Sequence, residues 1–519
     1  MPPRQVNKWI ITLSVMIPTL IEILDTSVAN VALDHMRGSL SAGQEEVTWV
    51  LTSYLVANAV VIPMSGWLAR FMGRKRYLLA SLVLFTVSSL LCGAATSLAQ
   101  LVFFRVIQGV GGGGLQPMSQ AILLETFPPH ERGMAMAVFG MGVVVGPILG
   151  PLLGGWLTDA YSWRWIFYIN LPIGILALAM NWAFVHDPDY MERRASGEKV
   201  DYVGLALLCL GIGSLQIVLD KGQIEDWFNS GFIVALSAVA AVCLVALVFW
   251  ELAHERPILN LRAFANRSFA MGNLFMFMGF FAFFGSIVLL PLFLQTLMGY
   301  TAYLAGVVLG PGGCLAILVM PVVGKLTQRL DARLLIGVGM GVTAWSLYYM
   351  SGFTLHIDFA TAVTGRIIQG LGMPFFFVAV TFATMATVPR EQMNNASAIY
   401  NLLRNLGGSF GVAFVTTLLA RRTQHHHSVL SEHMSPLDPG FSLRLDALAS
   451  QLAARLGEFA DTTGLALGAI YREMNRQAAA LAYADAFLAQ ALIFVGLMGL
   501  IWIMRRPPVG APPGADAGH

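Results

Sequence analysis

Residues Trp9–Leu33, WIITLSVMIPTLIEILDTSVANVAL, indicate the fold class of this chain. This segment is apolar over the ~20 residues that a helix needs to cross a bilayer, yet it contains the acids Glu22 and Asp25. Because the acids are three positions apart, a helix places both on one face. A charge near the bilayer centre costs at least ~2.5–3.5 kcal/mol, so such residues usually face a partner or a water-filled path. The stretch therefore predicts a membrane helix with a functional acidic face.

Asp25 is the deeper acid and precedes the polar Thr26 and Ser27. We interpret Asp25 as a proton-carrying site of a transporter, assisted by Glu22. The alternative for each acid is a side chain that reaches toward the membrane surface or sits in a fixed ion pair. Polar residues at comparable depth in this and other apolar segments are candidates for a substrate cavity: Thr26, Asn30, Tyr54, Asn58, Gln295 and Arg404.

Composition places the whole chain in a membrane. Of its 519 residues 56% are hydrophobic and 12% are charged, where a soluble domain has about 25% charged residues. The net charge of +2 gives no reason to expect a nucleic-acid partner. All four cysteines lie in apolar runs and are expected to be small buried hydrophobes. The first span is too long and too acidic for a cleaved signal peptide, so we expect it to be retained.

Fourteen apolar segments are long enough to span a bilayer. They cover about 9–33, 47–69, 77–97, 99–124, 133–158, 164–185, 202–220, 230–250, 269–295, 303–326, 333–352, 358–386, 395–420 and 485–504. Lys and Arg concentrate in the loops on the side of the termini, by roughly six to one, which predicts cytoplasmic termini. The polar segment 421–484 then lies outside, where 442–457 and 464–482 predict a short helical cap. The tail 505–519 is expected to be disordered.

The chain contains an internal repeat. RVIQGVG at Arg105–Gly111 recurs as RIIQGLG at Arg366–Gly372, and Gly66–Arg70 has a weaker echo at Gly324–Gln328. The offset maps the first six spans onto the last six, and such parallel halves are known among secondary transporters. We predict an all-α membrane protein with two six-helix bundles, 1–185 and 268–504, around a two-span insert at 186–267. Chance repetition of a short Gly-rich string is the alternative.

The fifth predicted span has a glycine at every fourth position. The stripe and one intervening proline are Gly142, Gly146, Pro147, Gly150 and Gly154. Small residues at this spacing let a second helix approach closely, and prolines weaken the helical hydrogen bonds, which suits a helix that bends. Simple small-residue packing is the plainer interpretation of the same pattern.

Arg105 is a second charge within an apolar span. An arginine keeps its proton in a protein, so it needs a carboxylate, a carbonyl or water. Asp25 or Glu22 is the expected partner, and the pairing would tune the acid's affinity for a proton; a purely structural ion pair is the alternative. Arg366 and Arg404 have no obvious matching acid, so we expect them to be stabilising or substrate-facing.

Other motifs argue against an enzyme, a cofactor and a metal site. The string Gly109–Gly114 fits G-x-G-x-x-G, but no strand precedes it and it lies inside an apolar span. The run His425–His427 lacks other ligands at metal-binding spacing, and no nucleophile elbow is present. The Phe- and Met-rich stretches 269–293 and 375–382 are expected to pack mainly against lipid and helices, with a fraction lining an adaptable apolar cavity.

These motifs together resemble the fourteen-span drug/proton antiporters of the major facilitator superfamily. The resemblance rests on Leu24–Leu33, Leu101–Gly114, Gly142–Gly155 and Trp163–Gly174. It implies proton coupling through the first-span acid and alternating access. Segments 211–220 and 226–228 and the long outer loop resemble multidrug efflux proteins of the Gram-negative inner membrane. That likeness implies a periplasmic adaptor of the membrane-fusion type and an outer-membrane channel as partners.

One position departs from the family pattern, since Arg70 stands where the loop after the second span usually has an acid. Any conformational latch in which that acid forms an ion pair across the cytoplasmic face must be weaker here or work differently. The sequence predicts a proton-coupled exporter of hydrophobic compounds in the inner membrane. A single-purpose exporter or importer of a metabolite such as a fatty acid is the nearer alternative, and a membrane sensor or lipid-acting enzyme the more remote one.

Overall fold

The computed structural model describes residues 7–187, 201–254, 257–432, 434–435, 437–456 and 461–504, and these contain helices and no strand. Fourteen helical segments in these ranges are long and apolar enough to span a membrane, which is the predicted number. The first six are α1 (Lys8–Val31), α3 with α4 (Gln44–Val47, Trp49–Met72), α5 (Arg74–Ala94), α6 with α7 (Leu98–Gly112, Leu115–Thr126), α8 (Arg132–Ala160), and α9 with α10 (Trp165–Tyr168, Asn170–Phe184).

The remaining spans are α11 (Tyr202–Lys221), α12 (Gly231–Ala253), α13 (Arg267–Thr296), α14 (Ala302–Leu326), α15 (Ala332–Ser351), α16 (Phe359–Met385), α17 (Met393–Ser431) and α19 (Thr462–Met498). The short helices between them are α2 (Leu33–Leu40), α18 (Pro439–Leu456), and the 3-10 turns η1 (Pro129–Glu131), η2 (Trp227–Asn229), η3 (Leu261–Ala265), η4 (Arg390–Gln392) and η5 (Ile501–Ile503).

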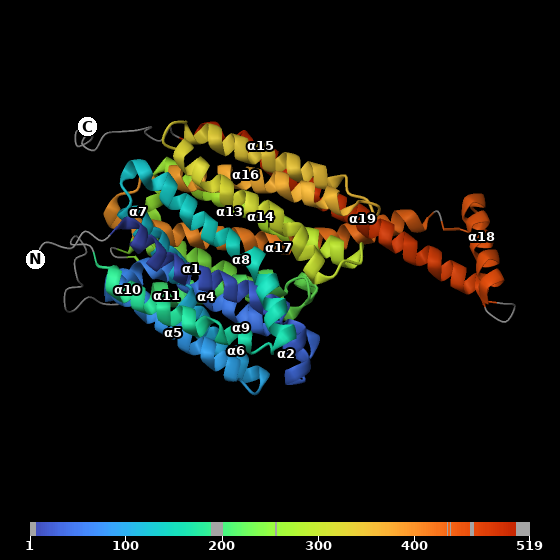
Figure 1. Ribbon diagram of the computed structural model, residues 1–519, viewed down its shortest axis with the longest axis horizontal. Helices are drawn as coiled ribbons and strands as arrows, with labels where there is room; N and C mark the ends of the chain where they lie inside the picture. The colour runs from blue at the N-terminus through green and yellow to red at the C-terminus, as the bar shows by residue number, and fades with distance from the viewer. Residues whose placement is uncertain are drawn as a thin grey trace, which may run out of the picture.

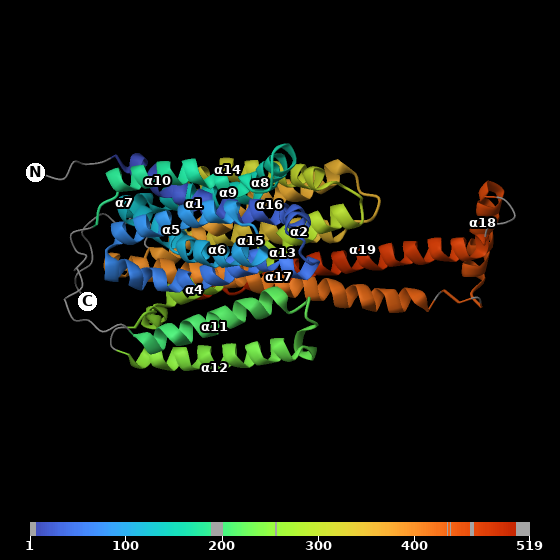
Figure 2. The ribbon, with the colours of Figure 1, turned by 90° about the horizontal axis from the view of Figure 1, so that it is seen from below.

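The spans form two six-helix bundles that pack side by side (Figure 1). The contact between them is made mainly by α8 against α14 and by α17 against α4 and α7. The two extra spans lie together along one side, as Figure 2 shows, with α11 on α4 and α17 and with α12 outermost. Val242 and Phe249 of α12 are exposed, which is the arrangement expected for a helix that faces lipid.

One predicted span is interrupted. The sequence predicts a continuous helix over 99–124, but α6 ends at Gly112 and α7 begins at Leu115. Consecutive glycines have a low helix propensity, and the missing side chains let α4 approach. A Cβ atom on Gly113 would lie 2.8 Å from the carbonyl oxygen of Asn58. The break directly precedes Gln116 and Gln120, which both belong to buried polar networks.

The outer segment also differs from the prediction. The helix expected at 442–457 is α18, but the one expected at 464–482 is the first part of α19 rather than a separate helix. The Ala-rich run before Tyr483 favours an unbroken helix. With 39 residues, α17 is about 58 Å long at 1.5 Å per residue. α17 and α19 therefore project together beyond the bundle, with α18 across their tip (Figures 1 and 2). The predicted tail 505–519 lies outside the described residues.

At the opposite end, the loop between α4 and α5 is held by charged side chains. Arg74 donates to both carboxylate oxygens of Glu125, at 2.6 and 2.9 Å, and the backbone N–H of Lys75 donates to Asp187. Arg70, at the position where the family pattern has an acid, donates to the carbonyl of Pro257, in the segment between α12 and α13. This departure from the pattern therefore connects the loop to the chain that enters the second bundle.

Candidate functional site

Asp25 lies on the buried face of α1, and 2% of it is exposed. Its Oδ2 accepts a hydrogen bond from Arg105 Nη1 at 2.5 Å. Its Oδ1 accepts from Gln108 Nε2 at 2.9 Å and from Asn170 Nδ2 at 2.8 Å. Four side chains from α1, α6 and α10 thus form one network inside the first bundle, with the carboxylate at its centre.

Arg105 has a counter-ion and further hydrogen-bond partners, and its Nη2 alone is buried without a hydrogen-bond partner. It is fully buried, its Nε donates to the carbonyl of Val50 at 3.0 Å, and its Nη1 donates to Gln108 as well as to Asp25. The centre of its guanidinium lies 4.2 Å from the centroid of the Tyr54 ring, which is cation–π range. Of the two acids expected as its partner, the structure pairs Arg105 with Asp25.

Glu22, one helical turn earlier, has neutral partners. It is buried and accepts hydrogen bonds from Gln116 Nε2, from Asn58 Nδ2 at 3.1 Å and from Tyr54 Oη at 3.4 Å. No Lys or Arg within the described ranges forms an ion pair with it. The Gln116 carbonyl in turn accepts from Arg404 Nη2 of α17. Glu22 is therefore linked to the second bundle through a single amide side chain.

A second amide pair joins the bundles close by, because Asn401 of α17 donates to Gln120 of α7. Both side chains are fully buried. Gln116 and Gln120 are one turn apart on α7, directly after the glycine break. The break thus brings the polar face of α7 to the boundary between the bundles.

The other cavity candidates separate into two groups. Tyr54 and Asn58 belong to the Glu22 network, whereas the Thr26 hydroxyl donates to the carbonyl of Glu22 in its own helix. Asn30 and Gln295 are exposed, and the structure does not bring them into the buried networks.

Sequence reasoning missed Gln108, Gln116 and Asn170 as partners of the two acids. Gln108 could have been found from its position one turn after Arg105, whereas Asn170 lies in the Trp163–Gly174 motif but its contact with α1 depends on how distant spans pack.

The glycine stripe of α8 faces α1. Cβ atoms on Gly146 and Gly150 would collide with Ile23 and Ser27, and one on Gly154 would lie 3.1 Å from the carbonyl oxygen of Val28. A Cβ atom on Gly142 would likewise collide with Met16. The helix runs without a break through Pro147. The stripe thus lets α8 pack directly against the helix that carries both acids.

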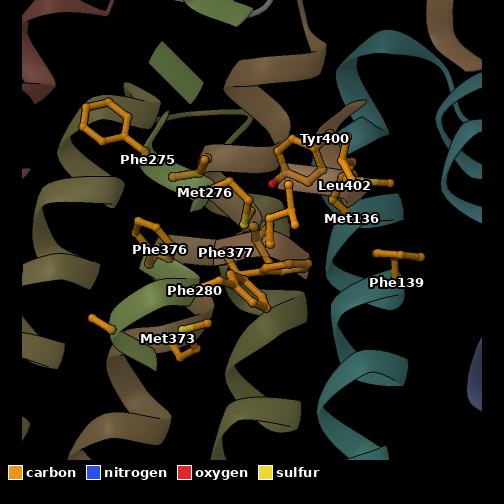
Figure 3. Close-up of a cluster of buried hydrophobic side chains, with 14 of the residues drawn as sticks. Met136, Phe139, Phe275, Met276, Phe280, Met373, Phe376, Phe377, Tyr400 and Leu402 are labelled. Carbon is orange, nitrogen blue, oxygen red and sulfur yellow. The ribbon is translucent and has the colours of Figure 1, made fainter. Parts of the chain in front are cut away.

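A largely apolar cavity lies at the boundary between the bundles, between α8, α13, α14 and α16. It holds about 760 Å³ of space, its open mouth included. The lining consists of Gly140, Val143, Val144, Ile148, Phe280, Phe283, Phe284, Ile287, Leu309, Gly312, Gly313, Ala316, Met320, Arg366, Gln369, Gly370, Met373 and Phe377. Figure 3 shows Phe280 and Phe377 side by side, with ring centroids 5.9 Å apart. Phenylalanines from both predicted Phe-rich stretches therefore line this cavity.

The histidine run has partners of its own. His426 Nε2 lies 2.7 Å from Asp485 Oδ2, and His427 lies beside Tyr471. Within the part of the chain that the structure describes, no three His, Cys, Asp or Glu residues are grouped as metal ligands. The four cysteines are unpaired, and only Cys92 is fully buried.

Comparisons with known proteins agree with this architecture. The chain is 38% identical to the "Multidrug export protein EmrB" of Haemophilus influenzae and to that of Escherichia coli, in each case over 98% of both chains. It is 37% identical to the "Fatty acid resistance protein FarB" of Neisseria gonorrhoeae over 96% of both chains. The solved structure of the proton:xylose symporter XylE, 15% identical, superposes with a TM-score of 0.60 over 96% of both chains and so shares the fold. Residues 15–412 match the Major Facilitator Superfamily, and the chain belongs to that family of membrane transporters.

Proposed function

We propose that this protein exports hydrophobic compounds across the bacterial inner membrane in exchange for protons. The two bundles alternate in opening the cavity to either side, with both termini in the cytoplasm. The observation that carries the proposal is the pair of buried acids one turn apart on α1, Asp25 and Glu22. Asp25 is held by a cation, whereas Glu22 is held by neutral donors that reach the second bundle. The identity to multidrug export proteins supports the choice of cargo.

The contacts of Glu22 suggest how a proton could be coupled to movement. An ionised Glu22 accepts hydrogen bonds, and the amide of Gln116 relays its charge to Arg404 across the boundary. A protonated Glu22 loses most of this attraction, because hydrogen bonds to a charged group are roughly twice as strong as neutral ones. Uptake of a proton therefore loosens the bridge between the bundles, and its release restores the bridge.

Asp25 and Arg105 have a complementary role in this proposal. Arg105 provides the buried counter-ion of Asp25. A proton reaches Asp25 only when the ion pair separates, and the carbonyl of Val50 and the amide of Gln108 then remain as partners for the guanidinium. Asp25 is tied to the first bundle by this ion pair, and Glu22 is tied to the boundary through Gln116.

The driving force is sufficient for a modest gradient. One proton that crosses ~100 mV supplies about 2.3 kcal/mol. Each unit of pH difference adds roughly 1.4 kcal/mol. At one proton per neutral substrate, the sum supports a concentration ratio of a few hundredfold.

The projecting hairpin of α17 and α19 supports a further part of the proposal. It extends well past the bundle, opposite the end where α1 begins (Figure 1). We place it in the periplasm, where it would contact an adaptor of the membrane-fusion type, and an outer-membrane channel would complete the route.

A narrower cargo is the second candidate, because a fatty acid resistance protein shares 37% identity with this chain over nearly the full length. Growth of cells with and without the gene on a panel of dyes, antibiotics and fatty acids separates the two. Broad protection supports multidrug export, and protection against fatty acids alone supports the narrower function.

The test is transport by purified protein in proteoliposomes. Efflux of several fluorescent dyes should follow an imposed pH gradient and stop when a protonophore collapses it. Glu22→Gln and Asp25→Asn should each abolish the pH-driven part, provided that the variants elute as folded protein. Full pH-driven transport by both variants would falsify the role of the acids, and wild-type protein that ignores the gradient would refute proton coupling.

A further inference from the structure

The two copies of the internal repeat differ at one decisive position. Arg366 and Gln369 in α16 correspond to Arg105 and Gln108 in α6, at an offset of 261 residues (366 minus 105). The same offset carries Asp25 of α1 to Ser286 of α13 (25 plus 261). The second bundle thus repeats the arginine and the glutamine, but a hydroxyl group replaces the carboxylate.

The structure confirms that these residues again form one network. Gln369 donates to Ser286 Oγ at 2.7 Å, as Gln108 donates to Asp25, and Arg366 Nη1 donates to the Gln369 carbonyl. The correspondence therefore holds in space as well as in sequence. The two networks differ in one respect, because the second bundle lacks the negative charge that Asp25 supplies in the first.

Arg366 consequently has no counter-ion. It is 9% exposed, its Nε is buried without a hydrogen-bond partner, and no carboxylate in the described ranges forms an ion pair with it. An arginine retains its proton in a protein, and a buried charge without a partner is strongly unfavourable. The second bundle therefore contains a fixed positive charge that attracts an anion.

The same guanidinium lines the apolar cavity between the bundles. Phe280, Phe283, Phe284 and Phe377 form much of the remaining wall. The guanidinium of Arg404 lies 5.6 Å from the Phe280 ring centroid, and its Nη1 is also buried without a hydrogen-bond partner. The lining therefore combines the charge of Arg366 with a large apolar surface, and Arg404 adds a second positive charge close by.

We propose that this cavity binds amphipathic monoanions, with the acidic head group on Arg366 and the hydrocarbon or aromatic part among the phenylalanines. The inference rests on the proposed export function and specifies the class of cargo and the place where it is held. The ligand anion supplies to Arg366 the charge that Asp25 supplies to Arg105. A cation of the same shape is repelled by Arg366, and a neutral compound leaves its charge unpaired.

The test is binding of radiolabelled dodecanoate to purified protein in detergent. Dodecanol and dodecyltrimethylammonium serve as neutral and cationic competitors of equal chain length. We expect the wild-type protein to bind dodecanoate, and the two competitors to displace it roughly ten-fold less well than unlabelled dodecanoate. Arg366→Gln should weaken dodecanoate binding roughly ten- to a hundred-fold, and Arg366→Lys should restore part of the affinity.

A second pair of variants tests the missing charge without removing the arginine. Ser286→Asp gives Arg366 a counter-ion of its own, and Ser286→Asn adds nearly the same bulk without charge. Dodecanoate should bind the Asp variant at least roughly ten-fold more weakly than the Asn variant. Equal affinities in this pair, or wild-type affinity in Arg366→Gln, would overturn the proposal.

Binding and transport distinguish this inference from the function on which it rests. Arg366-dependent binding in a protein without pH-driven efflux supports the anion site and contradicts the proposed exporter. Efflux of neutral or cationic dyes with dodecanoate binding that ignores Arg366 supports the exporter and overturns the anion site.

Discussion

At the scale of single residues, two acids one turn apart have different environments. Asp25 contacts a fully buried cation, whereas Glu22 contacts amide and hydroxyl groups. The difference arises because Arg105 and Asn170 reach Asp25, whereas side chains of α4 and α7 reach Glu22. The two side chains are therefore expected to contribute unequally to stability, although both serve the same proposed function.

Asp25→Asn should destabilise the protein much more than Glu22→Gln. Loss of the carboxylate leaves the Arg105 guanidinium buried without its counter-ion, which costs roughly 3–5 kcal/mol. Thermal unfolding in detergent should show a clear drop in Tm for Asp25→Asn and a smaller one for Glu22→Gln. The double variant Asp25→Asn/Arg105→Gln should recover part of the loss. A double variant less stable than Asp25→Asn would contradict the explanation.

The sequence predicted the need of Arg105 for an acid partner, since an arginine in an apolar span requires one. It did not choose between Asp25 and Glu22, because both lie on one helix face and the choice depends on how α6 is rotated. Asn170 was missed for a similar reason, as its role depends on a contact between α10 and α1. The correspondence of Ser286 with Asp25 rests on its contact with Gln369, which a single span does not reveal.

At the scale of helices, apolar length was enough to locate the spans, whereas breaks and extensions depended on packing. The glycine break after α6 lies where the missing side chains let α4 approach. The outward extension of α17 and α19 is polar, so hydropathy ended the span of α17 too early and began that of α19 too late. Contacts between α17 and α19, including the Arg422–Asp485 ion pair, hold this extension together.

The glycine stripe gives a prediction with an internal control. Gly146→Ala places a methyl group against Ile23 of α1, whereas a Cβ on Gly155, in the same helix, meets no atom within 4 Å. Overpacking of this kind typically costs about 1–3 kcal/mol. Gly146→Ala should therefore lower the Tm and slow dye efflux, and Gly155→Ala should change neither. Equal effects of the two variants would show that close packing of α8 on α1 is unimportant.

The hairpin gives a second prediction at this scale. Asp485 of α19 accepts hydrogen bonds from Arg422 Nε at 2.6 Å and lies 2.7 Å from His426 Nε2, both on α17. Asp485→Asn removes the charge that joins the two helices. Hydrogen–deuterium exchange should then become faster in the outer part of α17, and stay unchanged in α1. Unaltered exchange in the hairpin would mean that apolar contacts alone hold it.

At the scale of the whole molecule, the two bundles share an architecture but differ in charge. The first contains its own acid–arginine pair, and the second has an arginine that faces a cavity. In this account the proton acts in the first bundle, the cargo binds at the boundary with the second, and the bridge from Glu22 through Gln116 to Arg404 connects them. The repeat was visible in the sequence, but this division of roles required the contacts.

The most direct measurement is proton release when a ligand binds to purified protein in weakly buffered detergent solution, followed with a pH indicator. An antiporter in which cargo and proton compete should release protons upon addition of a transported dye. The signal should disappear in the double variant Glu22→Gln/Asp25→Asn if that protein still binds the dye. Wild-type protein that binds dye without releasing protons, or a double variant that releases as many as wild type, would contradict the account.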